Sequence, residues 1–408
     1  MNTRQIRKIL KDTDRVRVSG TVAEKETAEY LLAACQALGA AAHLESFPVP
    51  MAEIQSASLR ADGREIPCKG YKHCAPGPVE APLCYLPSTE PAVLPQAKGK
   101  LVLLDSGLSH FLYQDLLAQG ALGFITYDGS VLQPDSDIDQ KELRELVAQG
   151  KRVPCVSIHA REAFKLVKAG PKLVRIAVEQ TETEGESHNV VAELPGLTEE
   201  WIVLTAHYDS TPLSRGSYDN MSGCIGLLGI LEAMAAKAPH RYGLRFVFCG
   251  SEERGLLGSK AYVAAHEAEL EKVALNINLD MIGTVMGPFA ACATAEEKLV
   301  GYLQYLAAER GWGLKAWSGV YSSDSTPFAD KGVPAVSFAR LASSAQASIH
   351  NRYDTMAVLS EAQIQGDIGF ISDFTRRMAD AAVCPVARKI PDKLKTELDE
   401  YLCRKRKG

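Results

Sequence analysis

The chain has 408 residues and a formal net charge of −5, from 45 basic and 50 acidic residues. This length is too great for one ordinary hydrophobic core, so we expect two domains, and 46% apolar with 23% charged residues are typical of a globular protein. The slightly acidic balance argues against a nucleic-acid-binding protein, and no apolar run is long enough to cross a membrane.

Two features of the composition bear on the cellular compartment. The ten cysteines include no Cys-x-x-Cys pair, which indicates reduced core residues rather than a disulfide framework. Residues 1–11 lack the apolar stretch of a signal peptide. Both features favour a cytoplasmic location.

The chain opens with a helix–strand unit. An amphipathic helix is predicted over residues 24–38, because apolar side chains recur there at helical spacing and Gly39 provides a stop. A strand is expected over residues 42–48. We assign this unit to the larger of two domains, which comprises residues 1–51 and 181–408.

The region from residue 52 to residue 180 has a different character, with short predicted segments separated by prolines. Strands are expected at 100–104, 122–127, 153–158 and 172–178, and helices at 110–119, 139–149 and 160–168. His73, His110 and His159 each stand apart from other candidate ligands, which is typical of structural histidines. We therefore expect residues 52–180 to be an inserted mixed β/α domain without chemistry of its own.

The acidic, polar segment 181–187 is predicted to be a linker from its composition. Beyond it, strands alternate with helices. The strands are expected at 188–194, 201–206, 244–249, 273–279 and 335–339, and the helices at 221–236, 256–266, 296–309, 361–382 and 391–405. This alternation predicts an α/β fold with a mixed, largely parallel sheet between two layers of helices.

A histidine and two carboxylates follow the buried strand at 201–206. His207 and Asp209 are two residues apart, and the strand period of two places them on the same face. Asp219 follows just before the next helix. Such residues suit a divalent metal ion, although a surface histidine and a capping aspartate remain an alternative interpretation of this segment alone.

Further candidate ligands follow other strands. Glu252 and Glu253 come after the strand at 244–249, Asp280 comes directly after the strand at 273–279, and His350 lies in a polar loop. Taken singly, each of these residues has an ordinary explanation. The glutamates could interact favourably with the dipole of the helix that follows, Asp280 could cap a turn, and His350 could lie on the surface. Because sites in open α/β sheets form beyond the carboxyl ends of strands, their joint placement favours a metal site.

These motifs resemble those of the co-catalytic di-zinc aminopeptidases, the family of bacterial leucine aminopeptidase, aminopeptidase Y and glutamate carboxypeptidase II. The resemblance rests on segments 207–210, 218–223, 252–259 and 278–283 and on His350, in the order of the family. It implies the zinc exopeptidase fold, and the inserted region is similar to a protease-associated domain.

The resemblance also implies a role for each ligand. His207 and Asp280 would bind one Zn²⁺ ion. Glu253 and His350 would bind the other, and Co²⁺ or Mn²⁺ are alternatives to zinc. Asp219 would bridge the ions, and a cis peptide bond would join it to the next residue.

The two remaining acidic residues are expected to have roles other than metal binding. Glu252 would be the general base that activates a water molecule, and Asp209 would orient His207. The implied activity is the removal of N-terminal amino acids from peptides. A carboxypeptidase, or an amidohydrolase of small acyl-amino compounds, is the alternative, and the oligomeric state stays open.

Substrate-binding residues are less well defined, because the chain departs from the family pattern. Some members have a tyrosine directly before the last histidine, where this chain has Ile349. Tyr321 or Tyr353 could take that role. Arg340 and Arg352 are candidates for binding a substrate carboxylate, as a carboxypeptidase would require.

Overall fold

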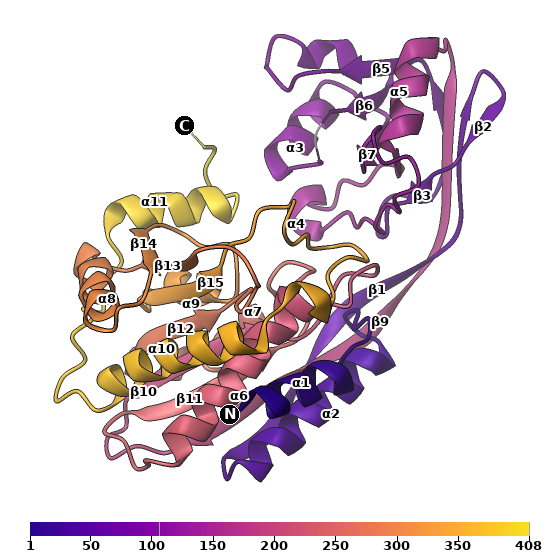
Figure 1. Cartoon of the computed structure of the whole chain (residues 1–408). Coiled ribbons are helices and arrows are strands. Elements are labelled where there is room, and N and C mark those ends of the chain that lie inside the picture. Colours follow the sequence, from indigo (N-terminus) through magenta and orange to yellow (C-terminus); the bar gives the residue numbers. More distant parts are fainter. Residues whose placement is uncertain (106, 408) are drawn as a thin grey trace. The chain divides into compact units, whose positions relative to one another are not determined.

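The computed structural model describes residues 1–105 and 107–407 of the chain. Over these residues, the chain forms two compact units (Figure 1). The larger unit comprises Met1–Val49 and Gly185–Lys407, and the second unit comprises Pro50–Glu184. No helix in the described part of the chain combines the length and the apolar character needed to cross a membrane.

A mixed β-sheet forms the centre of the larger unit. The strand order is β14-β13-β15-β12-β10-β11-β9-β1. The strands are β1 (Ala41–Ala61), β9 (Val174–Leu194), β10 (Trp201–His207), β11 (Gly243–Cys249), β12 (Val273–Leu279), β13 (Phe289–Thr294), β14 (Leu314–Ser318) and β15 (Ala335–Arg340). Strands β11, β10, β12 and β15 run parallel, whereas β9 and β13 are antiparallel to their neighbours β11 and β15. This arrangement confirms the predicted mixed, largely parallel sheet.

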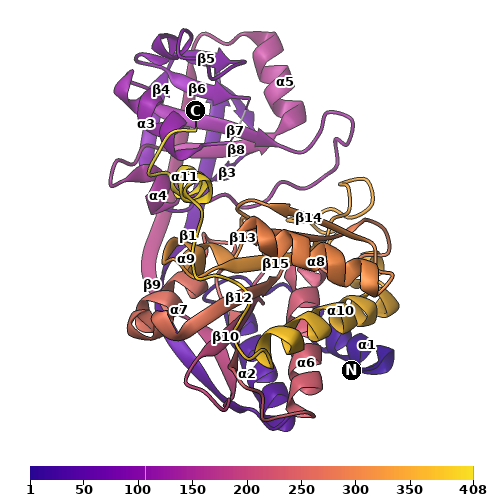
Figure 2. The same ribbon diagram turned by 90° about the vertical axis from the view of Figure 1, so that its left-hand side faces the viewer.

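Helices cover both faces of this sheet (Figures 1 and 2). They are α1 (Thr3–Asp12), α2 (Val22–Ala37), α6 (Ser222–Ala235), α7 (Leu257–Ala265), α8 (Glu297–Glu309), α9 (Ser325–Asp330), α10 (Glu361–Ala379) and α11 (Asp392–Tyr401), with the short turns η2 (Ser217–Met221), η3 (Glu267–Lys272) and η4 (Met356–Val358). Successive side chains of β10 belong to different hydrophobic clusters: Leu204 belongs to the cluster that includes residues of α1, α2, α6, α8 and α10, and Val203 belongs to the cluster that includes residues of α7 and α9. Because successive side chains of a strand point to opposite faces of the sheet, β10 contributes to the hydrophobic layers on both faces.

The carboxyl ends of the parallel strands lie at one edge of the sheet. His207, the last residue of β10, is level with Cys249, the last residue of β11. Helix α6 approaches the end of β12 closely, since a Cβ atom on Gly223 would clash with the carbonyl oxygen of Leu279. Glycine at this position therefore brings η2, which precedes α6, beside the residue that follows β12.

The second unit has its own sheet and its own core. The sheet has the order β3-β8-β7-β6-β5, and the distal parts of β1 and β9 pair with β2 and β4. Its elements are β2 (Arg64–Ile66), β3 (Lys69–Gly70), β4 (Gly77–Ala81), β5 (Leu83–Leu86), η1 (Leu94–Ala97), β6 (Leu101–Leu104), α3 (His110–Ala118), β7 (Gly123–Asp128), α4 (Glu145–Ala148), β8 (Cys155–His159) and α5 (Ala160–Ala169). Strands β5 to β8 are parallel. The mixed β/α character predicted for this region is present, and its relation to a protease-associated domain stays a prediction.

Two local predictions are wrong. Residues 181–187 are part of the long strand β9 rather than a linker. Polar composition did not reveal this strand, because a strand with exposed side chains is stabilised by backbone hydrogen bonds to its neighbour. The helix expected at 139–149 is restricted to α4, because the backbone of residues 141–143 pairs with Lys72 as a β-bridge instead.

Candidate metal centre

The sequence-predicted ligands come from separate elements that meet at the carboxyl edge of the larger sheet. His207 ends β10, and Asp280 follows β12 directly. Asp219 lies within η2, between β10 and α6, and its peptide bond to Asn220 is cis, as predicted. Glu253 lies four residues beyond the end of β11.

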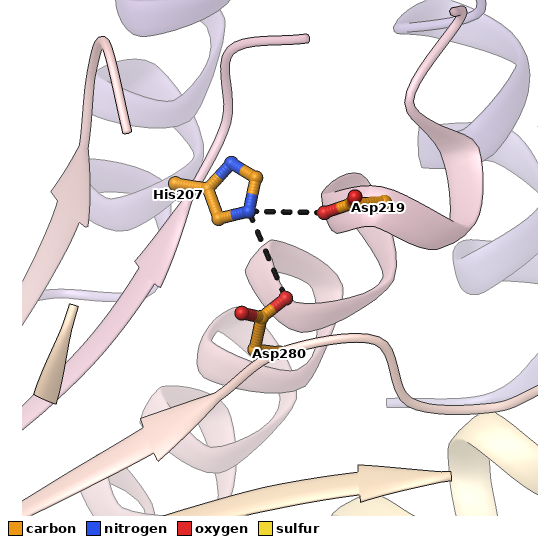
Figure 3. Close-up of side chains that lie close together, drawn as sticks. All are labelled: His207, Asp219 and Asp280. Atoms are coloured by element: carbon orange, nitrogen blue, oxygen red, sulfur yellow. Dashed lines mark ion pairs between the residues drawn. The ribbon is translucent and has the colours of Figure 1, made fainter. Parts of the chain in front are cut away.

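His207, Asp219 and Asp280 form one cluster (Figure 3). The Nε2 atom of His207 lies 3.1 Å from Oδ1 of Asp219 and 3.7 Å from Oδ1 of Asp280. All three residues are at most 6% exposed. One ligand atom from each residue lies within 4.8 Å of the others, which is close enough for a common metal ion.

Asp219 also belongs to a second cluster, with Glu253 and His350. Here the Nε2 atom of His350 lies 3.1 Å from Oδ2 of Asp219 and 3.1 Å from Oε2 of Glu253. The two carboxylate oxygens of Asp219 therefore face different histidines. This is the arrangement that a carboxylate bridging two ions requires.

The chemistry of both clusters fits divalent cations. Imidazole nitrogens and carboxylate oxygens are the donors that zinc and similar ions take in proteins. Oδ1 of Asp280 is buried and has no hydrogen-bond partner among the described residues, although buried polar atoms are ordinarily paired. A cation between these groups would supply the missing partner.

The ionisation of the histidines is consistent with this interpretation. Burial lowers the pKa of His350, but its ion pairs with Asp219 and Glu253 outweigh burial and raise the pKa to about 11. For His207, the carboxylates around it likewise outweigh burial and raise the pKa well above its usual value. The surrounding carboxylates thus favour a positive charge at both imidazoles, and a metal ion would supply that charge in place of protons.

Asp209 connects the two clusters. Its Oδ1 atom lies 3.3 Å from Nδ1 of His207. The same carboxylate accepts the backbone N–H groups of Glu252 at 2.9 Å and Glu253 at 3.1 Å. Asp209 therefore contacts a ligand of one cluster and holds the loop that provides a ligand of the other.

Glu252 lies beside the clusters without belonging to either. Its Oε2 atom is 3.8 Å from Nε2 of His207. Burial raises the pKa of Glu252 well above its usual value, and the nearby carboxylates of Asp324 and Glu253 add to this rise. A carboxylate with a raised affinity for protons, next to a metal site, is suited to proton transfer.

The candidate substrate-binding residues have different surroundings. The guanidinium of Arg340 is bound to both carboxylate oxygens of Asp367 and to the carbonyl of Gly287, so it is engaged inside the protein. Arg352 and Tyr353 are exposed and pack on each other, with the guanidinium carbon 5.6 Å from the ring centroid. None of these residues belongs to a metal cluster of the described chain.

Tyr321 lies in the electrostatic field of the centre. Burial raises the pKa of its phenol, and the carboxylates of Asp280 and Asp219 raise it further. Tyr321 is thus the substrate-binding candidate whose pKa depends on the carboxylates of the clusters.

Asp354 contributes to the site and was not assigned a role from the sequence. It is fully buried, and it accepts the backbone N–H groups of Tyr218 at 2.7 Å and Asp219 at 3.2 Å. It also accepts the hydroxyl of Ser214 at 3.1 Å. The only hint in the sequence is its position four residues after His350, in the same polar loop.

Comparison with known proteins agrees with this geometry. Residues 189–368 match peptidase family M28. Aminopeptidase YwaD of Bacillus subtilis is 25% identical over 79% of this chain and 71% of its own length. Leucine aminopeptidase 2 of Arthroderma otae is 27% identical over 66% of this chain, and the probable lipoprotein aminopeptidase LpqL of Mycobacterium tuberculosis is 25% identical over 69%. The match spans 55% and 57%, respectively, of the length of these two relatives.

Solved structures show the same fold. An aminopeptidase from Aneurinibacillus sp. strain AM-1 superposes with a TM-score of 0.77 at 22% identity, over 95% of this chain and 96% of its own. The zinc aminopeptidase BSAP from Bacillus subtilis gives 0.76 at 23% identity, over 96% and 99%. The residues that match peptidase family M28, 189–368, carry both clusters.

Proposed function

We propose that this protein is a metal-dependent aminopeptidase that removes N-terminal amino acids from peptides with the help of two Zn²⁺ ions. The observation that carries the proposal is the position of Asp219, whose two oxygens each face a histidine of a different cluster. The family match and the aminopeptidases among the relatives support the activity. Zinc is supported by the donor set and by the name of BSAP, and Co²⁺ or Mn²⁺ would suit the same donors.

Each ligand would have a defined place. His207 and Asp280 would hold one ion. Glu253 and His350 would hold the other, and Asp219 would contact both. When bound, such a pair of ions lowers the pKa of a water molecule and polarises the scissile carbonyl group.

The chain itself would move the proton. Glu252 would accept a proton from the attacking water and deliver it to the leaving amine; its carboxylate lies beside the clusters and belongs to neither, which supports this role. Asp209 would keep the imidazole of His207 in one orientation through Nδ1. Through the N–H of Glu252 it would also hold the base in place.

The alternative activities receive less support. A carboxypeptidase needs a cation for the terminal carboxylate, and Arg340 is already paired with Asp367. Arg352 is left as the exposed candidate. An amidohydrolase of small acyl-amino compounds would use the same centre, and no relative described above is named as one. A cytoplasmic location remains our expectation, and one relative is named as a probable lipoprotein aminopeptidase.

A peptide blocked at either end in turn tests the proposal. We expect hydrolysis to stop when the amino end is acetylated and to continue when the carboxyl end is amidated. Metal analysis of the same preparation should find about two ions per chain, and a chelator should abolish hydrolysis until zinc, cobalt or manganese is returned. Full activity in metal-free protein, or the opposite response to end-blocking, would contradict the proposal.

A further inference from the structure

The segment between α1 and the first turn of α2, residues 13–24, contains buried polar residues although it lies outside the part that matches the family. We call it the brace segment. Its side chains Arg17 and Glu24 are 0% and 1% exposed. Charged residues are almost never fully buried unless they are paired, so the partners of these two side chains are informative.

Arg17 binds the loop that joins β10 to η2. Its guanidinium donates to the carbonyl oxygens of Tyr208 at 2.6 Å, Arg215 at 2.5 Å and Gly216 at 2.9 Å. Its backbone is also tied to Ser210, through Arg17 N to Ser210 Oγ at 2.9 Å and Ser210 N to Arg17 O at 3.1 Å. Arg17 thus holds both ends of the loop.

This loop connects two candidate metal ligands. His207 precedes it directly, and Asp219 follows it three residues after Gly216. The Nη1 atom of Arg17, which also donates to Arg215, donates to the carbonyl oxygens of Thr13 and Arg15 within the brace segment. A planar guanidinium with donors in a fixed fork can therefore set the distance between the loop and the N-terminal segment.

Glu24 binds the other loop of the centre. Its Oε1 atom accepts the N–H of Ser251 at 3.1 Å, the hydroxyl of Ser251 at 3.2 Å and the hydroxyl of Ser187 at 2.8 Å. Its Oε2 atom accepts the N–H of Gly20 at 2.6 Å. Ser251 has a left-handed backbone with φ of 57°, a conformation that needs support from its surroundings in a residue other than glycine.

Ser251 immediately precedes the proposed base and the ligand after it. Asp209 accepts the N–H groups of Glu252 and Glu253, so successive N–H groups from 251 to 253 are held by two buried carboxylates. Glu24 holds the first of these groups and Asp209 the other two. The direction in which both glutamates leave the strand end therefore depends on Glu24.

We propose that Arg17 and Glu24 are positioning residues of the metal centre: Arg17 places Asp219 between the two ions, and Glu24 places Glu252 and Glu253. This inference rests on the proposed function for the identity of the centre. Neither side chain would touch an ion or the substrate. Because misplacement of a reacting group by about 1 Å can reduce the rate about 10²-fold, such support is expected to matter.

The role of Arg17 is tested with Arg17→Met and Arg17→Lys in the full chain. We expect Arg17→Met to bind Zn²⁺ and Co²⁺ about 10–100-fold more weakly, as is typical when a partner behind a ligand is lost. The visible spectrum of the Co²⁺ form should change. The metal affinity of Arg17→Lys should lie between those of the parent protein and Arg17→Met. Arg15→Met is the matched control, because Arg15 is on the same segment and pairs with Glu26 at the surface.

The role of Glu24 is tested with Glu24→Gln, against Glu26→Gln as the exposed control. We expect kcat to fall about 10–100-fold with little change in KM, because the base is displaced while the substrate site is intact. Binding of the ion that Glu253 and His350 would hold should weaken, and the Co²⁺ spectrum should shift. Both control variants should match the parent protein in metal affinity and in kcat.

Circular dichroism and thermal unfolding of the metal-free variants separate positioning from folding. Folded variants with parental metal affinity, spectrum and kcat would overturn the inference, and so would failure of Arg17→Met and Arg17→Lys alike to fold. If Arg17→Met fails to fold but Arg17→Lys folds, the metal affinity and Co²⁺ spectrum of Arg17→Lys test the inference. A parent protein that hydrolyses no peptide would refute the proposed function. The metal affinities of the Arg17 and Glu24 variants would still test the positioning role.

Discussion

The two units carry similar residues at corresponding places, yet only one of them forms a metal-type cluster within the described chain. In the larger unit, β10 and β12 lead to His207 and Asp280. In the second unit, the parallel strands β6, β7 and β8 lead to Asp105, Asp128 and His159. Strand ends with carboxylates and a histidine are therefore not sufficient for a metal centre.

The difference lies in what these side chains contact. Asp105 is exposed, Asp128 pairs with Lys141 at 2.7 Å, and His159 accepts the N–H of Arg161 at 3.0 Å as a helix cap. Each group is satisfied separately. In the larger unit, His207, Asp219 and Asp280 are buried and face one another, so their charges need a common partner.

The change Asp219→Ala tests this comparison most severely. It removes the group that both clusters share, so we expect metal content to fall to background. Losing a residue that only supports a ligand typically reduces activity about 10–100-fold, and we expect hydrolysis to fall by more than this. Metal analysis and peptide assays measure both effects. Asp128→Ala in the second unit should change neither, and two ions retained in Asp219→Ala would show that the clusters are not joined.

The change Glu252→Gln separates proton transfer from metal binding. It keeps the size of the side chain and removes its ability to take a proton, so kcat should fall about 10²–10⁴-fold. Metal content should stay at the parental level, because Glu252 belongs to neither cluster. Near-normal turnover would show that another group is the base.

The change Arg340→Met asks whether a buried charge belongs to the site or to the core. It leaves Asp367 buried without its partner, so we expect a loss of about 3–5 kcal/mol in the free energy of unfolding. Urea unfolding measures this loss, and KM for peptides should hardly change. Parental stability with a raised KM would instead assign Arg340 to substrate recognition.

The change His159→Ala should have the smallest effect. It removes the acceptor for the N–H of Arg161 at the start of α5, which typically costs about 0.5–2 kcal/mol of stability. Metal content and kcat should equal those of the parent. A fall in bound metal would mean that the second unit contributes ligands after all.

The larger sheet and its chemistry were accessible from the sequence because their signals are local. Buried strands such as β10 and β12 are short apolar runs, and their polar ends follow directly in the chain. The strands β13 and β14 and the helices α1 and α9 were not predicted. Strand β13, for example, has three alanines among its six residues, and alanine has little preference for strands; the strand is defined by pairing with β15 and β14.

The sequence by itself determined the kind of fold and the candidate ligands, since both follow from residue type and spacing along each segment. Only the tertiary structure decided which groups share a partner. It placed Asp219 between His207 and His350, and it used Arg17 and Glu24 to hold the loops that carry the site. These contacts join residues that are far apart in the chain, and the free energy of burying a charge depends on those distant partners rather than on local sequence.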